Sequence, residues 1–392
     1  MPLDLDLLRK TLGSSKVLSD SPSITAYSVD AGIYKIPPQA IVLLESGEDM
    51  ERVMAFSRQH QVPLTARSGG TNLAGNAIGP GIVLEFSRMN RLLEIDGRNG
   101  WARVEPGMVY AEMNRELSKF GWMYGPDPSS GDACKIGGMI GNNSAGPHTL
   151  KYGAVKDNLL ALEILLPDGK WIDAREYRLE DPDFLSLQNE IPAIGELVRI
   201  VRENQALLLD KKKRVKKNSS GYNLFGLAEG VRGGVFPLHL LFTGSEGTLG
   251  LVREAKLRLA RKPPEAATAL IYFKSLREMS DAVGKILGLS PSALEMMDRN
   301  SLDLVGRGKF GIPPDAEALL LAEFDETVQT KMGHLREVVS RYDLSVPIAE
   351  AYDPERQAEL WRARKGINPA LYRFDPGKKP IHFVDDVVVP QE

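Results

Sequence analysis

Three glycine-rich segments contain most of the residues that could hold a ligand. The first, ARSGGTNLAGNA (66–77), directly follows an apolar run. Its adjacent glycines allow a sharp turn in which successive N–H groups point into one concavity, which binds anions. Thr71 and Asn72 add side-chain donors and Arg67 adds charge, so this segment suits a pyrophosphate. It lacks the GxGxxG spacing, so no Rossmann fold is implied.

The second and third segments suit a flat ligand. The second consists of GPDPSS (125–130) and IGGMIGNNSAG (136–146), and the third is TGSEGTLG (243–250). Small residues let the backbone approach a ligand closely, while amides and hydroxyls supply hydrogen bonds. Each segment taken singly is also compatible with a flexible turn, so their joint presence carries the interpretation.

A basic cluster near the C-terminal end offers a second kind of chemistry. WRARK (361–365) lies on an expected helix, and Lys379 follows. A guanidinium can grip a carboxylate through two parallel hydrogen bonds. The alternative is a solvated basic face, which is also the more common reading for the run KKKRVKK (211–217).

Other reactive side chains show no paired arrangement. The five histidines are scattered and no pair has metal-ligand spacing, so no metal site is expected. His148 and His382 are expected to be structural, and Cys134 to be a small buried residue without a base beside it.

The elements that must position these segments alternate in type. A helix capped by Ser46, with Asp49 reaching back, lies between apolar strands, which predicts a βαβ unit. Tyr110, Met113, Leu117 and Phe120 predict a helix ended by Gly121, and residues 125–153 are expected to form a long functional loop. The strands are expected at 40–44, 62–66, 82–86, 162–166 and 251–259.

A charged, proline-rich stretch at 261–265 marks the best domain boundary. Beyond it, a helix capped by Ser275 should carry Leu276, Met279, Val283 and Ile286 on its apolar face. The strands there are expected at 267–273, 293–298, 318–324, 344–349 and 381–389.

Composition limits the setting of the protein. The net charge of −3 gives no global attraction to nucleic acid or to an acidic membrane. The N-terminus lacks an apolar signal segment, and no apolar run reaches the ~20 residues of a membrane span. With one cysteine the chain cannot form an internal disulfide or hold an iron–sulfur cluster, so a cytoplasmic setting is expected.

Together, the three segments and NSSGYNL (218–224) resemble the FAD-binding domain of the vanillyl-alcohol oxidase/p-cresol methylhydroxylase (PCMH-type) superfamily, over residues 30–259. The most similar branch is that of glycolate oxidase subunits and D-lactate dehydrogenases, and within it the large bacterial proteins that fuse FAD and iron–sulfur domains. The resemblance implies an α+β fold. It comprises a lead-in (1–32), a two-subdomain FAD-binding domain (33–260, subdomains 33–97 and 98–260) and a C-terminally incomplete α/β substrate domain with an antiparallel sheet (266–392).

The same resemblance assigns roles to residues. Arg364 and Lys379 would bind the substrate carboxylate, and FAD would be non-covalent because no histidine occurs between His60 and His148. The residues implied to bind FAD are Arg67, Ser68, Gly69, Gly70, Thr71, Asn72, Gly75, Asn76, Pro126, Asp127, Ser129, Gly137, Gly138, Asn142, Ser144, Gly146, Glu246, Gly247 and Val252.

The implied activity is oxidation of a D-2-hydroxy acid of the D-lactate, glycolate or D-2-hydroxyglutarate type by hydride transfer to flavin. Electrons would pass to an iron–sulfur partner or to a lost downstream domain, and peripheral membrane association could come through partners. The family's histidine-rich segment, which supplies the base, has no counterpart in this sequence, so the base is expected in a missing C-terminal part. The alternatives are a truncated, non-catalytic FAD-binding subunit and an NADPH-dependent flavin reductase of the same superfamily.

Overall fold

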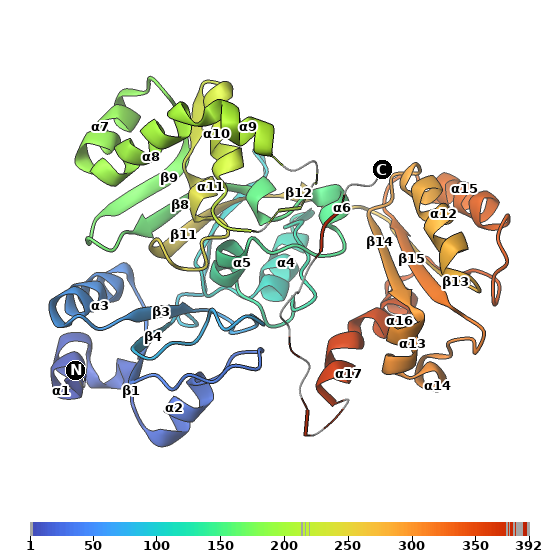
Figure 1. Ribbon diagram of the computed structural model, residues 1–392, viewed down its shortest axis with the longest axis horizontal. Coiled ribbons are helices and arrows are strands. Elements are labelled where there is room, and N and C mark those ends of the chain that lie inside the picture. Colours follow the sequence, from blue (N-terminus) through green and yellow to red (C-terminus); the bar gives the residue numbers. More distant parts are fainter. Residues whose placement is uncertain are drawn as a thin grey trace.

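Two larger β-sheets and one two-stranded sheet form in the N-terminal part of the chain (residues 3–261), and a third larger sheet forms in the C-terminal part (residues 267–373), as Figure 1 shows. The computed structural model describes residues 3–212, 215, 217–218, 220–373, 375, 377–378, 381 and 387–389. In this part of the chain no helix is both long and apolar enough to cross a bilayer.

The first sheet has the strand order β1-β2-β4-β3. Its strands are β1 (Val17–Leu18), β2 (Ala40–Leu43), β3 (Leu64–Arg67) and β4 (Ile82–Glu85). β4 pairs in parallel with both β2 and β3, and α3 (Gly47–His60) makes the crossover, so the βαβ prediction is confirmed. Ser46 caps α3 as expected. Asp49, however, accepts from the N–H of Glu45 at 3.0 Å instead of that of Ser46, because it is drawn to Lys16 at 2.7 Å.

The expected polar lead-in is part of this first core. It contains α1 (Leu5–Leu12), β1 and α2 (Ser21–Tyr27). Leu8, Leu12 and Val17 are buried against the first sheet, and β1 adds an antiparallel edge strand to β2. The lead-in is therefore integral because it covers apolar surface that the βαβ unit would otherwise expose.

The second sheet is antiparallel, with the order β10-β9-β8-β11-β6-β5. The predicted hairpin is formed by β8 (Leu159–Leu165) and β9 (Trp171–Arg178), and β11 (Leu251–Arg258) pairs with β8. The other strands are β5 (Leu92–Asp96), β6 (Trp101–Val104) and β10 (Val235–Pro237). The helices of this region are α4 (Tyr110–Ser118), α7 (Pro182–Glu190), α8 (Pro192–Glu203), α9 (Gln205–Lys211), α10 (Leu224–Arg232) and α11 (His239–Phe242).

Two details of α4 and its surroundings differ from expectation. Phe120 lies beyond the end of α4 and is 60% exposed, while Gly121 adopts a positive φ of 73° as a terminating glycine should. A separate two-stranded sheet of β7 (Trp122–Met123) and β12 (Ala260–Arg261) then continues the regular structure to Arg261, at the start of the expected linker.

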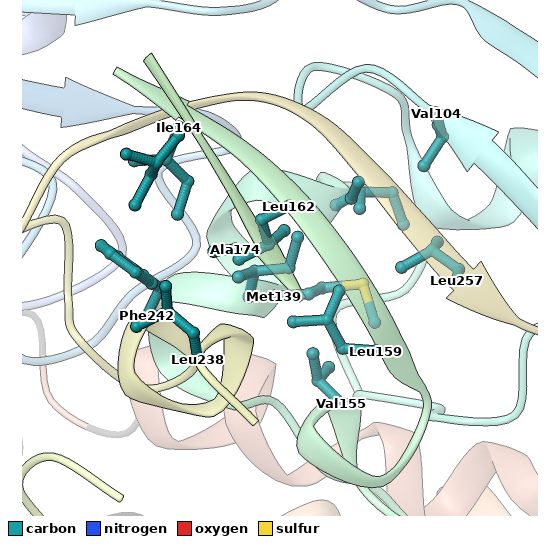
Figure 2. Packing of buried hydrophobic residues seen from close by; sticks show 14 of the residues in the cluster. Val104, Met139, Val155, Leu159, Leu162, Ile164, Ala174, Leu238, Phe242 and Leu257 are labelled. Carbon is teal, nitrogen blue, oxygen red and sulfur yellow. The ribbon is translucent and has the colours of Figure 1, made fainter. Parts of the chain in front are cut away.

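The expected long loop contains two helices, α5 (Ile136–Asn142) and α6 (Thr149–Tyr152). Ile136, Met139 and Ile140 recur at helical spacing and are buried at 0–1% exposure. Figure 2 shows Met139 among Leu159 and Leu162 of β8. Burial of this stripe stabilises a helix whose glycines, read alone, predict a loop.

The third sheet is antiparallel, with the order β14-β15-β13-β16, and has helices on both faces. β13 (Ala267–Phe273), β14 (Ala293–Asp298) and β15 (Ala318–Phe324) lie where the sequence predicts. α12 (Leu276–Leu287) and α15 (Val328–Val339) cover one face, and α13 (Arg299–Val305) and α16 (Pro354–Lys365) the other. The short helices α14 (Arg307–Phe310) and α17 (Ile367–Arg373) complete this part.

Three predictions for the C-terminal part need comment. The strand expected at 344–349 is instead β16 (Ala349–Ala351), because Pro347 lacks the N–H that a ladder needs and Leu344 makes only an isolated bridge. Leu276, expected on the apolar face of α12, is 50% exposed, whereas Met279 and Ile286 are buried. The strand expected at 381–389 falls mostly outside the described residues.

Candidate functional site

The first loop, α5 and the third loop enclose one cleft. Twelve of the nineteen residues expected to bind FAD line it: Ser68, Gly69, Gly70, Thr71, Asn72, Asn76, Gly137, Gly138, Asn142, Glu246, Gly247 and Val252. The structure adds lining residues that the sequence did not single out: Ala66, Ala77, Phe86, Pro106, Lys135, Ile140, Gly141, Phe242, Ser245, Gly250 and Leu251.

Arg67 stabilises the first loop from outside the cleft. Its Nη1 donates to the carbonyls of Val29 at 2.8 Å and Ala77 at 3.3 Å, and its guanidinium lies over the ring of Tyr27. Gly70 turns the loop at a φ of 62°, where an added Cβ would lie 2.5 Å from the Arg67 side chain. The position of Arg67 thus favours a role in loop conformation over direct contact with an anion.

α5 packs directly against the first loop. A Cβ at Gly137 would lie 2.7 Å from Pro106 Cβ and 3.0 Å from Ser68 Oγ, so this glycine is needed for close packing. Gly138 differs, because the nearest atom to its Cβ would be Ser68 Cβ at 3.6 Å. Gly138 therefore presents open backbone to the cleft.

The third loop is hydrogen-bonded to the end of α5. Gly244 donates to the carbonyl of Ile140 and Glu246 to that of Gly141, both at 2.9 Å. Glu246 and Gly247 adopt positive φ angles of 54° and 75°, which turn the loop over the cleft. The first and third loops therefore both pack on α5, although they lie far apart in the sequence.

Lys135 supplies the only positive charge among the described residues that line the cleft. Its Nζ lies 3.4 Å from the Ser68 carbonyl and 3.5 Å from Glu85, and it also donates to Ser87 Oγ. A partly buried lysine beside a glycine-rich turn suits a phosphate group. The one signal in the sequence that could have identified Lys135 as a cleft residue is its position directly before the glycine-rich stretch that begins at Ile136.

The donor set and the shape of the cleft fit FAD. Backbone turns at Gly70 and Gly247 and the Lys135 ammonium suit the pyrophosphate, and the bare backbone at Gly138 and Gly141 leaves room for a flat ring.

The remaining predicted residues lie away from this cleft. They are Arg67, Gly75, Pro126, Asp127, Ser129, Ser144 and Gly146. A Cβ at Gly146 would lie 1.5 Å from the Asp127 carbonyl oxygen, so this glycine lets the second segment pack on itself. The second segment is therefore divided: 137–142 line the cleft, whereas 125–130 and 144–146 lie beside it.

His148 connects this segment to the C-terminal part of the chain. Its Nδ1 lies 2.6 Å from Asp127 Oδ2 and its Nε2 lies 2.7 Å from Glu323 Oε1. Burial disfavours the charged ring, but the hydrogen bonds with Asp127 and Glu323 prevail and raise the pKa of His148 to about 10. Nearby, Lys151 binds Asp325 at 2.6 Å, and Tyr152 also donates to this carboxylate.

Arg364 lies on α16, with its Nε 2.6 Å from Glu295 Oε2 of β14. Arg364 does not line the cleft formed by the three loops, and Lys379 lies outside the described residues. Trp361, one turn earlier on α16, donates to Glu323 Oε2 at 3.1 Å. The predicted substrate residue is thus on the helix that contacts the His148 network.

The other reactive side chains show no catalytic arrangement. Cys134 is 4% exposed, and burial raises the pKa of its thiol to about 11, which agrees with a structural residue. Burial lowers the pKa of His239 to about 4. In the described residues no group of three or more His, Cys, Asp or Glu side chains could hold a metal ion. In the basic run, Lys211 pairs with Asp210 and Lys212 with Glu229.

Comparisons with known proteins agree with this architecture. Residues 38–175 match the family model described as FAD binding domain, and residues 262–392 match FAD linked oxidases, C-terminal domain. The glycolate oxidase subunit GlcD of Bacillus subtilis is 31% identical over 93% of this chain and 68% of its own length. The Escherichia coli subunit is 29% identical over 94% and 65%, respectively. The D-2-hydroxyglutarate dehydrogenase of Pseudomonas putida is 29% identical, and this chain spans 41% of its length.

A solved structure of alkyldihydroxyacetonephosphate synthase superposes with a TM-score of 0.65 at 17% identity, covering 94% of this chain and 63% of the other. At this identity the likeness concerns the fold alone. The mixed α+β architecture with antiparallel sheets is the expected PCMH-type fold, so the fold-class prediction is confirmed.

Proposed function

The chain belongs to the family of FAD-linked oxidases, and from this premise we propose that it takes part in the FAD-dependent oxidation of a small D-2-hydroxy acid. The observation that carries the proposal is the cleft formed by two separate glycine loops around α5, with Lys135 at its wall. Relatives named glycolate oxidase subunit and D-2-hydroxyglutarate dehydrogenase support the substrate class.

The residues lining the cleft would hold FAD without a covalent bond. Ser68 to Asn72 and Lys135 would bind the pyrophosphate, and the bare backbone of Gly138 and Gly141 would lie against the flavin. No histidine is among the described residues lining the cleft, which supports non-covalent attachment. When bound, FAD supplies a two-electron acceptor for the hydride on the hydroxyl-bearing carbon.

Arg364 and Lys379 would bind the substrate carboxylate. Glu295 occupies the Nε edge of the Arg364 guanidinium, which fixes its plane. A guanidinium also has an end-on edge with two parallel N–H donors that matches a carboxylate. Orienting the carboxylate would in turn orient the reacting carbon, which contributes to rate through proximity.

We also propose that electrons leave through an iron–sulfur partner or domain. The chain has one cysteine, whereas an iron–sulfur cluster requires several thiolates.

Two measurements on the full chain test these proposals. First, the protein is reconstituted with FAD and desalted, and its visible spectrum is recorded before and after acid precipitation. A flavin spectrum at one FAD per chain, with the flavin released by acid, supports non-covalent binding. A folded chain that takes up no FAD would refute the proposed cofactor site.

Second, the reconstituted protein is mixed anaerobically with D-lactate, glycolate or D-2-hydroxyglutarate while the flavin absorbance is followed. Bleaching by one of these acids supports the proposed reaction, and the matching L-acid serves as the stereochemical control. Bound FAD that no hydroxy acid bleaches, but that NADPH does, would support the flavin reductase alternative. Bound FAD that none of these donors bleaches would support the non-catalytic subunit.

A further inference from the structure

A chain of hydrogen-bonded side chains runs from the second glycine-rich segment to helix α16. Asp127 contacts His148 at 2.6 Å, His148 contacts Glu323 at 2.7 Å, and Glu323 accepts from Trp361 at 3.1 Å. Asp127 and His148 belong to the N-terminal part, and Glu323 and Trp361 to the C-terminal part. Figure 1 shows α6, which follows His148, beside β14 at this junction.

The partners of His148 fix its state of protonation. Both ring nitrogens face carboxylate oxygens, and an ionised carboxylate only accepts hydrogen bonds, so opposite ionised Asp127 and Glu323 both nitrogens donate. Only the protonated imidazole donates from both nitrogens. The His148 side chain is 24% exposed, and the hydrogen bonds raise its pKa to about 10, so the ring is charged at neutral pH.

Glu323, the partner of His148 in the C-terminal part, is itself held by hydrogen bonds. Its side chain is 12% exposed and accepts from Thr268 at 3.2 Å as well as from Trp361. A buried carboxylate that loses its cationic partner is destabilising, because its charge is left uncompensated. His148 therefore joins the segment of Asp127 to β15 and α16, which are fixed to each other through Glu323 and Trp361.

We propose that His148 is a positioning residue that holds α16, and with it Arg364, in register with the cleft between the glycine loops. The proposal rests on the proposed function, in which Arg364 binds the substrate carboxylate and the cleft holds FAD. Arg364 follows Trp361 by three residues, so a shift of α16 at Trp361 moves the guanidinium as well. His148 itself does not line the cleft and is not a catalytic residue.

The Lys151–Asp325 ion pair does not duplicate this link. Asp325 follows β15 and contacts Lys151 and Tyr152, whereas Glu323 also accepts from Trp361 of α16. We expect that pair to hold the two parts together, whereas His148 sets the position of α16.

The first test measures the arrangement of the two parts without any reaction. Spin labels are attached at Asn99→Cys and Glu337→Cys, two exposed positions on either side of the junction, and the interlabel distance is measured by pulsed electron resonance. In His148→Gln the amide can donate to one carboxylate while its oxygen faces the other. We expect a broadened or shifted distance distribution, whereas His334→Gln, at an exposed histidine of α15, serves as the matched control and leaves it unchanged.

A rescue separates charge pairing from simple packing. In His148→Gln/Glu323→Gln the second amide can donate to the first, while its oxygen still accepts from Trp361. We expect this double variant to recover the narrow distribution. An unchanged distribution in His148→Gln, or a distribution that stays broad in the double variant, would overturn the proposal.

The second test measures FAD affinity and flavin reduction separately. We expect His148→Gln to bind FAD as the wild type does, but to be reduced by saturating hydroxy acid about 10- to 100-fold more slowly, the cost of a misplacement of ~1 Å. If none of the hydroxy acids reduces the flavin of the wild type, the proposed function fails. The distance measurement then still decides the role of His148. If His148→Gln loses FAD itself, the positioning role between the two parts is refuted.

Discussion

The contrast between Gly137 and Gly138 gives a prediction in which neighbouring residues should behave differently. Both lie in α5 and line the cleft. The Cβ of Gly137→Ala would lie 2.7 Å from Pro106 Cβ, against ~3.5–4.0 Å for an ordinary carbon contact. The Cβ of Gly138→Ala would lie 3.6 Å from its nearest atom, which requires no movement.

The expected energies follow from these distances. Replacing glycine by alanine within a helix contributes up to ~1 kcal/mol, and this gain is common to both variants. Overpacking in Gly137→Ala costs about 1–3 kcal/mol, because the Pro106 ring cannot rotate away. We therefore expect the FAD-free Gly137→Ala to be about 1–3 kcal/mol less stable than Gly138→Ala.

For FAD binding we expect the direct effect in Gly138→Ala, the variant whose stability is not reduced by overpacking. The methyl group of Gly138→Ala projects into the cleft, so we expect FAD affinity to fall about tenfold, equivalent to ~1.4 kcal/mol, in a protein that is otherwise stable. Urea unfolding of the FAD-free proteins and fluorescence titration with FAD measure the two effects. Equal stabilities of the two variants would refute the packing argument, and unchanged FAD affinity in Gly138→Ala would place the flavin elsewhere.

Three further predictions address other parts of the molecule. The pKa of His148 is raised from 6.5 to about 10 in the folded protein, so its contribution to stability is full below pH 6.5 and is lost as the pH rises through about 10. Unfolding of the wild type and His148→Gln across this range should therefore converge at high pH, and a constant difference would contradict the charged pair. Gly284→Ala, in α12 with no atom within 4 Å of the added Cβ, should raise the free energy of unfolding by about 0.5–1 kcal/mol; a loss in urea unfolding would contradict this. Arg364→Lys should raise the KM for the hydroxy acid about 10- to 100-fold, because a charge-assisted bond contributes ~1.5–3 kcal/mol, and leave FAD affinity unchanged; an unaltered KM would exclude Arg364 from carboxylate binding.

Local patterns were sufficient for some of the strands and capped helices. The ladders of β13, β14 and β15 lie at the expected residues, because their apolar runs are bounded by clear turn and cap signals such as Ser275. The βαβ unit followed from apolar strands on either side of a capped helix. The prediction that the side chain of Asp49 bonds back to Ser46 was wrong, because Asp49 pairs with Lys16, which is distant in the sequence, and accepts from the N–H of Glu45.

The sequence by itself determined that three glycine-rich segments exist, and twelve of the residues they and their flanks offered line the cleft. Only the tertiary structure decided what each glycine does, because the atoms near Gly137 and Gly146 come from Pro106 and Asp127. It also decided that Arg67 turns away from the cleft and that Lys135 lies at its wall. The link from His148 to Glu323 joins residues 175 positions apart, and such pairing depends on how separately folded sheets meet.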